Sequence, residues 1–179
     1  MAWTAPATWV ADTILTAAQL NQQLRDNMSE TGPAKIGAAG QILVGTAANT
    51  LIARTPGTGY TSAGESTAST SYTDLTTPGP TYTVTTGTSS LIILTAFLRN
   101  NTVNAASKMS FDISGATTTS ASDTYCLLHI SATTNAAVTC SSCIFHEGMT
   151  GGSNTFTAKY RVDAGTGYFQ YRRIAVLPL

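Results

Sequence analysis

From residue 67 to residue 179, apolar and polar side chains alternate over short runs, and this pattern limits the possible folds more than any other feature. Turn-forming runs separate the stretches, including PGP at 78–80, TGTSS at 86–90 and DAGTG at 163–167. Such alternation is typical of strands with one buried face, and no helical period accompanies it. The stretches expected to form strands are Tyr82–Val84, Leu91–Leu98, Met109–Ile113, Tyr125–Ile130, Val138–His146, Phe156–Val162 and Tyr168–Val176.

About seven or eight strands with this spacing predict an antiparallel, jelly-roll-like β-sandwich over residues 67–179. The apolar run Ile174–Leu179 predicts that the last strand is central in the sandwich. Only 10% of the chain is charged, against about 25% in an average soluble domain. Threonine supplies the missing polarity and suits a half-buried sheet. A low-charge surface also fits a chain that packs among copies of itself.

Residues 33–66 are rich in Gly, Ala and Thr and form a second segment. Two short apolar runs, Ile42–Val44 and Leu51–Ala53, predict short strands with turns between them. The alternative is a flexible linker, but Gly/Ser linkers rarely carry such runs. We therefore expect a short shaft or linker with short strands.

Residues 1–32 are expected to form an N-terminal anchor arm and a helix near 17–30. Thr16 and Gln19 have the spacing of a capping box, and Leu15 and Leu20 that of a hydrophobic staple. Gly32 followed by Pro33 is a helix stop signal. One helical stripe collects the apolar residues Ala17, Leu20, Leu24 and Met28. A helix this short is marginal alone, so the stripe is expected to need a partner surface.

Both tryptophans of the chain, Trp3 and Trp9, lie within its first nine residues, and Pro6 between them favours an extended arm. One interpretation folds these side chains back onto the chain's own core. The other docks them into a second subunit or protein, since tryptophan is enriched at binding hot spots. We favour docking, because the Gly-rich segment that follows offers little local core.

Three thiols and both histidines fall within a short stretch of the chain, and these are zinc-ligand residue types. The candidates for a metal site are Cys126, His129, Cys140, Cys143 and His146. Residues three apart on a strand point to opposite faces, so the spacing favours small buried thiols over a metal site. We expect no metal and no other cofactor.

No enzyme signature is present: there is no GxSxG, no GxxxxGK[ST], and only Asp123 near His129 approximates a catalytic dyad. We expect a protein that is not an enzyme. Zero formal net charge gives no reason to expect nucleic acid or an anionic membrane as a partner. The longest apolar run, Leu91–Leu98, is too short to cross a bilayer. No secretory signal is visible, and three cysteines are an odd number, which indicates synthesis in a reducing cytosol.

Arginines and aromatic residues lie together near the C-terminus, at Arg172, Arg173, Tyr168, Phe169 and Tyr171. One interpretation is a patch that stacks sugars or nucleotides. The other is a terminal strand with its aromatic side chains inward and its arginine stems along the sheet. We favour the terminal strand.

The pattern W-T-A-P-x-T-W-V-x-x-x-x-L-T-A-A-x-L-N-x-x-L-R-D-N, from Trp3 to Asn27, resembles the N-terminal segment shared by many structural proteins of tailed bacteriophages. Residues 39–59 resemble a short shaft-like repeat of phage fibres, and residues 152–179 resemble the closing strands of the jelly-roll-like head domains of those proteins. The family includes tail fibres, minor tail proteins, head fibres and decoration proteins. Its members usually carry a basic residue where Ala7 stands, so one anchor contact differs here.

This resemblance implies a homotrimeric capsid decoration or minor capsid (head fibre) protein on the virion surface, made in the host bacterial cytoplasm. The N-terminus would bind the major capsid protein or another virion protein, and the sandwich would project outward. A tail fibre or minor tail protein is the first alternative, and a receptor-binding module that contacts a host surface glycan is the second. The expected anchoring residues are Trp3, Pro6, Trp9 and Val10. The expected trimer contacts are Leu15, Leu20, Leu24 and Met28.

Overall fold

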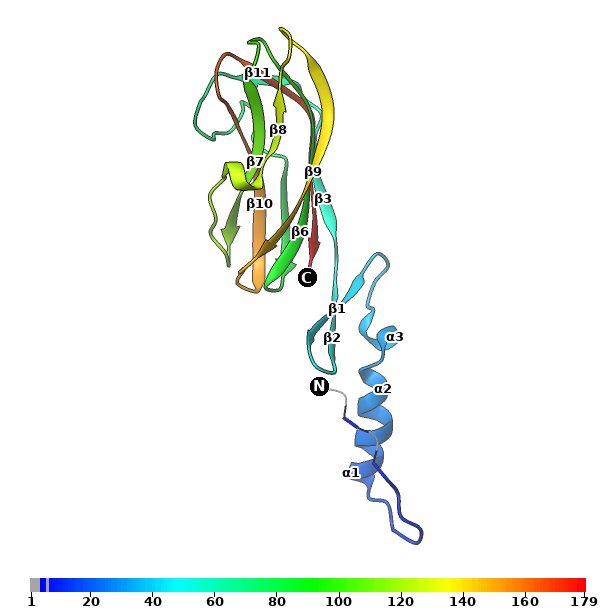
Figure 1. The fold of residues 1–179 in the computed structure, drawn as a ribbon. Coiled ribbons are helices and arrows are strands. Elements are labelled where there is room, and N and C mark those ends of the chain that lie inside the picture. Colours follow the sequence, from blue (N-terminus) through cyan, green and yellow to red (C-terminus); the bar gives the residue numbers. More distant parts are fainter. Residues whose placement is uncertain (1–3, 6) are drawn as a thin grey trace. The chain divides into compact units, whose positions relative to one another are not determined.

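A computed structural model describes residues 4–5 and 7–179, and the chain divides into two compact units. The first unit ends at Thr55 and contains helical turns and one hairpin; the second begins at Pro56 and is a β-sandwich (Figure 1). The boundary expected after residue 66 therefore lies too late in the chain. β3 (Gly57–Thr61) lies before the expected boundary and β4 (Glu65–Thr67) spans it, and both pair with a strand of the sandwich.

The expected helix begins where its capping box places it. The Gln19 N–H donates to Thr16 Oγ1 over 3.2 Å, and the Thr16 N–H donates to Gln19 Oε1 over 2.9 Å, so the box is confirmed. The helical run is not a uniform α-helix, because π-helical turns separate its two α-helical ends. Its parts are α1 (Ala17–Leu20), the π-helical η1 (Asn21–Asp26) and α2 (Asn27–Ser29).

A second, one-turn helix follows the first directly. α3 (Gly32–Lys35) has its proline in the first turn, where a missing N–H costs nothing, so Gly32–Pro33 restarts a helix as well as ending one. The expected short strands are confirmed as an antiparallel hairpin of β1 (Ile42–Ala47) and β2 (Thr50–Arg54). Asn49 turns the chain between them with a φ of 58°.

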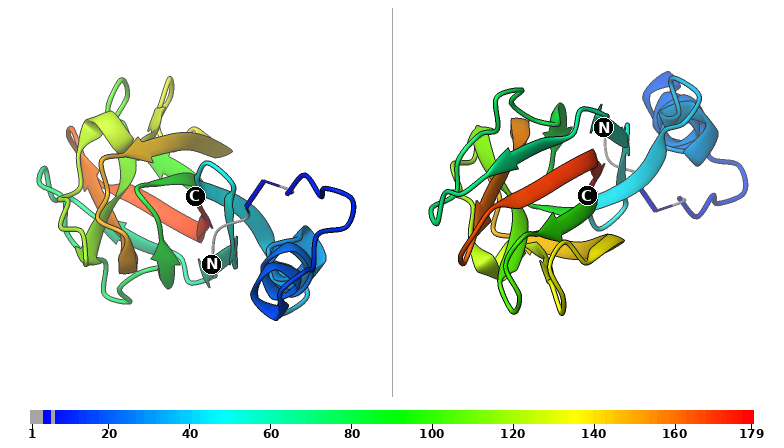
Figure 2. Two further views of the ribbon diagram at one scale, coloured as in Figure 1. Left: turned by 90° about the horizontal axis from the view of Figure 1, so that it is seen from below. Right: turned by 90° about the horizontal axis from the view of Figure 1, so that it is seen from above.

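The second unit is a sandwich of two antiparallel sheets. The first sheet has the order β5-β10-β7-β8, and the second has the order β3-β11-β6-β9 with β4 also paired to β11. This interleaved order is that of a jelly roll, and the two layers are visible in Figure 2. The remaining strands are β5 (Thr81–Thr86), β6 (Ser89–Asn100), β7 (Ala106–Gly115), β8 (Leu127–Ile130), β9 (Ala137–Glu147), β10 (Gly152–Val162) and β11 (Gly167–Pro178).

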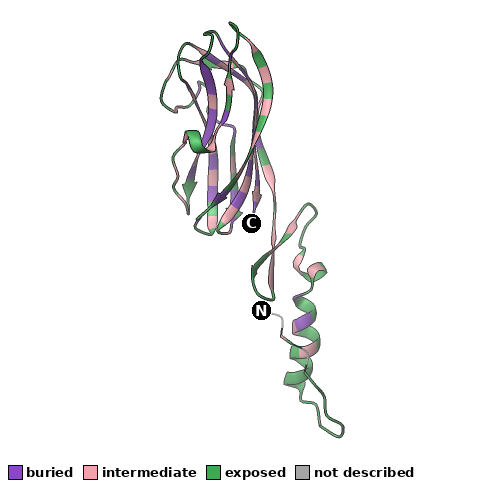
Figure 3. Cartoon of the chain, in the orientation of Figure 1, coloured by how far each residue is buried: buried purple, intermediate pink, exposed green. Residues whose placement is uncertain are grey.

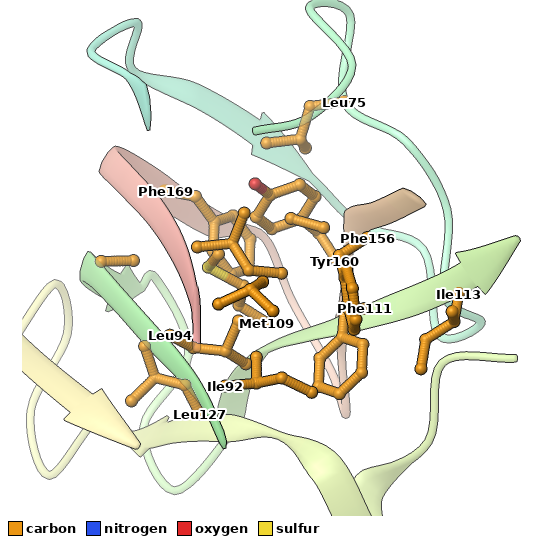
Figure 4. Close-up of a cluster of buried hydrophobic side chains, with 14 of the residues drawn as sticks. Leu75, Ile92, Leu94, Met109, Phe111, Ile113, Leu127, Phe156, Tyr160 and Phe169 are labelled. Atoms are coloured by element: carbon orange, nitrogen blue, oxygen red, sulfur yellow. The ribbon is translucent and has the colours of Figure 1, made fainter. Parts of the chain in front are cut away.

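The core lies between the two sheets and contains the side chains that alternation points inward (Figure 4). Aromatic rings fill its centre: Phe111 and Phe156 lie 6.1 Å apart between centroids, and Tyr160 and Phe169 lie 4.9 Å apart. Each fully buried large side chain stabilises the fold by about 1.5–3 kcal/mol. The sandwich therefore has a core of its own. β11 lies between β3 and β6, so the prediction of a central last strand is confirmed.

The C-terminal strand departs from the expected orientation at Arg172 and at two aromatic residues, since Tyr171 is 52% exposed and Tyr168 lies on the outer face beside Arg99. A β-bulge between Gln170 and Arg173, with Tyr171 at a φ of 53°, inserts one extra residue opposite β6. The bulge turns Arg172 into the core, where its side chain is fully buried, and leaves Arg173 outside. The expectation that both arginine stems lie along the sheet is therefore wrong for Arg172.

Candidate anchoring and assembly surfaces

The first unit lacks an apolar core. Among its described residues only Asn27 and Glu30 are buried, and both are polar (Figure 3). Glu30 forms an ion pair of 2.8 Å with Lys35. Polar contacts stabilise a fold far less than apolar burial does, since they replace hydrogen bonds to water. This unit therefore has little apolar burial of its own to stabilise it.

The N-terminal arm is held against the helix by two side-chain amides. Asn27 accepts from the Thr4 N–H and donates back to the Thr4 carbonyl, both over 3.0 Å. The Gln23 side chain accepts from the Ala7 N–H over 3.0 Å. Gln23 and Asn27 are four apart and so lie on one helix face. The two amides fix the backbone of the arm and leave its apolar side chains to other contacts.

The described residues of the expected anchor are exposed. Trp9 is 45% exposed and Val10 is 72% exposed, while the expected anchor residues Trp3 and Pro6 lie outside the described part of the chain. The chain turns directly after Val10, where its carbonyl accepts from the Thr13 N–H and Asp12 has a φ of 64°. Exposed large apolar side chains at a turn are typical of a binding surface.

The expected trimer-contact residues also form an exposed apolar set. Leu20, Leu24 and Met28 are four residues apart in turn and share one side of the helical run. These side chains are more exposed than is usual for leucine and methionine, and they occur along the whole length of the helical run. The exposed fractions are 40% for Leu15, 40% for Leu20, 58% for Leu24 and 67% for Met28.

The outer face of the β5-β10-β7-β8 sheet carries ion pairs. Asp123 accepts from the Arg161 guanidinium, from Lys108 Nζ over 2.8 Å and from the Tyr72 hydroxyl over 2.8 Å. Lys159 pairs with Asp74 over 2.9 Å. These contacts fasten two surface loops to the sheet. The Arg161 and Lys108 hydrogen bonds hold the pKa of Asp123 well below its ordinary value.

The low pKa of Asp123 makes its contribution to stability depend on pH. A carboxylate whose pKa falls on folding stabilises the protein above its unfolded pKa and loses this effect as the pH drops. We expect Asp123→Asn to lower the free energy of unfolding by about 1 kcal/mol at pH 7, because the side chain is half exposed. The difference from the wild type should shrink below about pH 4. Urea unfolding of the wild type and of Asp123→Asn across pH measures this difference.

The outer face of the other sheet is less polar. Its end near Leu91 is apolar, since Leu91 lies beside Phe145 of β9 and Leu177 of β11. Ile93 continues this surface beside Cys143, which is exposed. Phe145 is 53% exposed. A sheet with one wet face normally alternates apolar and polar residues, so β6 is unusually apolar on its outer side.

The same face also carries two arginines stacked on tyrosines, Arg99 at the end away from Leu91 and Arg173 midway, beside Thr95. The Arg99 guanidinium lies 4.5 Å from the centre of the Tyr168 ring, and that of Arg173 lies 5.0 Å from the Tyr60 ring. Among the described residues no carboxylate pairs with either arginine. Stacking holds each guanidinium in place and leaves N–H donors available for an anionic group.

The cysteine and histidine candidates do not converge. Cys140 is half-buried against the core, whereas Cys143 is exposed on the other face of β9, as strand geometry predicts. His129 Nε2 lies 3.0 Å from the Ala136 carbonyl, and Asp123 is held by Arg161, so the two form no dyad. In the described part of the chain no three His, Cys, Asp or Glu residues are arranged to hold a metal. His146 is buried, and burial lowers its pKa.

Sequence reasoning missed Gln23 and Asn27, which hold the arm, and the pairing of Arg99 with Tyr168. The spacing of the two amides, four residues apart on one helix, was the available signal. The arginine pairs had no local signal, because each joins two strands far apart in sequence. No helix in the described part of the chain is long and apolar enough to cross a membrane.

No protein-family model and no curated protein matches the chain. Solved structures resemble it at low identity. Eiger TNF from S. frugiperda is 10% identical over 70% of this chain and 92% of its own, with a TM-score of 0.46. A structure of infectious bursal disease virus Gx strain is 11% identical over 79% of this chain and 36% of its own, with a TM-score of 0.41.

A carbohydrate-binding module from Cellvibrio mixtus lichenase 5A, in complex with cellotriose, is 14% identical over 76% of this chain and 86% of its own. Its TM-score is 0.33. At these identities and scores the comparisons assign the chain to no family and no function.

Proposed function

We propose that the chain is a non-enzymatic structural component of a tailed-phage virion, a homotrimeric capsid decoration or minor capsid (head fibre) protein anchored by its first unit. The observation that carries the proposal is the absence of any buried apolar side chain among the described residues of that unit. A helix and a two-stranded hairpin without a core are marginal in water. Another chain must supply the missing apolar surface.

Other copies of the chain can supply part of that surface. Leu20, Leu24 and Met28 form one exposed stripe along the helix. Three parallel helices in a ring would bury three such stripes against one another, as in a short coiled coil. The capping box and the amide contacts to the arm set up the helix locally, so association has less chain to order.

A virion protein is proposed to cover the arm. Trp9 and Val10 are exposed beside the turn, and tryptophan is enriched at the centres of binding interfaces. The sandwich folds around a core of its own. The resemblance of Trp3–Asn27 to the N-terminal segment of phage structural proteins makes the major capsid protein or another virion protein the expected partner.

Electron microscopy of purified phage particles with gold-labelled antibody against the sandwich tests the proposal. Label over the heads is the expected result. Label only at the tail would replace the capsid assignment by the tail-fibre or minor-tail alternative. Particles without label, from which mass spectrometry also detects no chain, would overturn the virion assignment.

A second candidate function is binding of an anionic host surface glycan, and the arginine–tyrosine pairs favour it. Arg99 and Arg173 are separated by about 14 Å along the sheet, given roughly 3.4 Å per strand residue. This separation suits two anionic groups on an extended polymer better than one carboxylate. Among the described residues, the strands β3, β11, β6 and β9 carry on their outer side only these two arginines and Glu147 as charged residues, too little positive charge for nucleic acid.

We expect Arg99→Gln and Arg173→Gln each to weaken binding of an oligogalacturonate, an anionic polysaccharide fragment. The dissociation constant should rise by about tenfold, the change that follows from loss of one hydrogen bond to a charged group. Calorimetry measures this, with Arg25→Gln as a control of equal charge and a neutral maltooligosaccharide as a control ligand. Absence of binding by the wild type, or equal loss in the Arg25→Gln control, would remove this candidate.

A further inference from the structure

The strand β9 forms a long, regular sheet edge whose charged residue, Glu147, stands at its very end. It pairs with β6 from Ser89↔Glu147 to Arg99↔Ala137 without a bulge, and no described strand pairs with its other side. Its sequence, AVTCSSCIFHE, contains no lysine, arginine, proline or glycine. Natural proteins usually block such an edge with charge, proline, a bulge or a covering segment, because it offers a template for another strand.

The other sheet edges of the sandwich are blunted. β5 is short and follows Pro80, and β8 has four residues. The edge beside β11 is divided between β3 and β4. β9 differs from all of these in length and regularity, and Figure 1 shows it along one margin of the sandwich.

The core is also incompletely covered along β9. Its inward-facing side chains Val138, Cys140 and Ile144 pack against the core but remain partly exposed. On the outer face Phe145 is 53% exposed and Cys143 is exposed. Figure 3 shows exposed and intermediate residues alternating along most of the strand. A second strand beside β9 would cover apolar surface on both faces of the sheet.

We infer that two copies of the chain pair through their β9 edges, antiparallel and about a two-fold axis at Ser142. In this register each residue faces the one equally far from Ser142, so outward side chains meet outward side chains. Phe145 then faces Thr139 of the second copy, and Glu147 faces Ala137 of the second copy. The contact is isologous, with the same strand used by both copies.

Charge complementarity identifies a second copy as the occupant of this edge. Arg99 lies beside Ala137 in the sheet, and Glu147 of the second copy would lie on the other side of Ala137. Only this small residue would then separate the two opposite charges. Strands are about 4.8 Å apart, which puts the two Cα atoms about 10 Å apart, within reach of both side chains. Among the described residues neither Arg99 nor Glu147 has an ion-pair partner within its own chain. The two-fold axis forms this pair twice.

This contact does not depend on the proposed virion function. It gives an even number of chains, and because a two-fold contact cannot close a trimer, in a trimeric protein it would join copies from different trimers. It also removes Arg99 from the proposed glycan surface in the paired state.

Light scattering of the full chain over a range of concentrations tests the pairing. At high concentration we expect an assembly that contains an even number of chains. Cys143→Lys, which places a charge at the edge next to the axis, should raise its dissociation constant by about tenfold or more. The matched control Thr83→Lys adds the same charge on the outer face of β5 and should leave the mass unchanged. Unaltered association in Cys143→Lys, with circular dichroism showing a folded protein, would overturn the inference.

A charge swap tests the register. Arg99→Glu and Glu147→Arg should each weaken pairing, and the double variant should restore it, because the two charges exchange places across the interface. Failure of the double variant to restore pairing, when both single variants weaken it, would overturn the proposed register. If neither single variant weakens pairing, the charge argument for a second copy is overturned.

Discussion

Replacing Leu24 with glutamate is expected to dissociate the trimer into monomers while the β-sandwich stays folded. Leu24 is central in the stripe and 58% exposed in the single chain, so the proposed assembly buries it in all three copies. Each buried leucine contributes about 1.5–3 kcal/mol, and three unpaired carboxylates near one axis add a desolvation cost. Light scattering at micromolar concentrations measures the mass, and the thermal transition of the sandwich should not move.

The matched control for this variant is Gln22→Glu. Gln22 is exposed, and residues two apart on a helix do not share a face, so the same charge is added away from the stripe. The trimer should survive this change. A trimer that survives Leu24→Glu as well, or that dissociates equally in both variants, would show that the stripe is not the contact.

The second large effect is expected at the buried Arg172. Its Nη2 lies 3.8 Å from Glu65 Oε1, and its guanidinium lies 5.3 Å from the Tyr160 ring centre. We expect Glu65→Gln to lower the free energy of unfolding by about 2–3 kcal/mol, because it leaves a buried cation without its carboxylate. The amide can still accept from the Thr77 N–H, which donates to Glu65 over 2.9 Å. The midpoint of thermal unfolding should fall by about 5–10 °C.

A second substitution distinguishes the buried charge from other causes. Adding Arg172→Met to Glu65→Gln removes the cation that lost its partner, and the thioether can fill much of the same space. Most of the lost stability should return, since replacement of a whole buried ion pair by apolar groups is often neutral. A double variant as unstable as Glu65→Gln, or less stable, would show that loss of the counter-ion is not the cause.

The alternation of apolar and polar residues predicted the sandwich, because an inward-facing side chain at every second position leaves a direct trace in the sequence. It predicted β5 to β11 but not β3 or β4. Residues 57–61, GTGYT, have no apolar alternation, and the strand forms by backbone pairing with β11. Gly59 also passes close to β5, where a Cβ would lie 2.4 Å from the Thr81 carbonyl oxygen. This close approach depends on tertiary structure and has no local pattern.

The orientation of Arg172 was unpredictable for a related reason. Strict alternation from Phe169 points residue 172 outward, and only the extra residue of the bulge reverses it. The helix and its cap were predictable because their signals lie within four residues. Whether the exposed stripe contacts other copies depends on a partner chain, so neither the pattern nor the fold of one chain determines it.

The measurement that tests the central claim most directly is the mass of the dilute full-length chain by light scattering after size exclusion. The account predicts an assembly of three chains of 18.6 kDa, or a higher multiple of three at concentrations where β9 edges pair. A monomer in which Trp9 is shielded from a soluble quencher would contradict it. The arm would then pack within its own chain, and the exposed helix stripe would have no role in assembly.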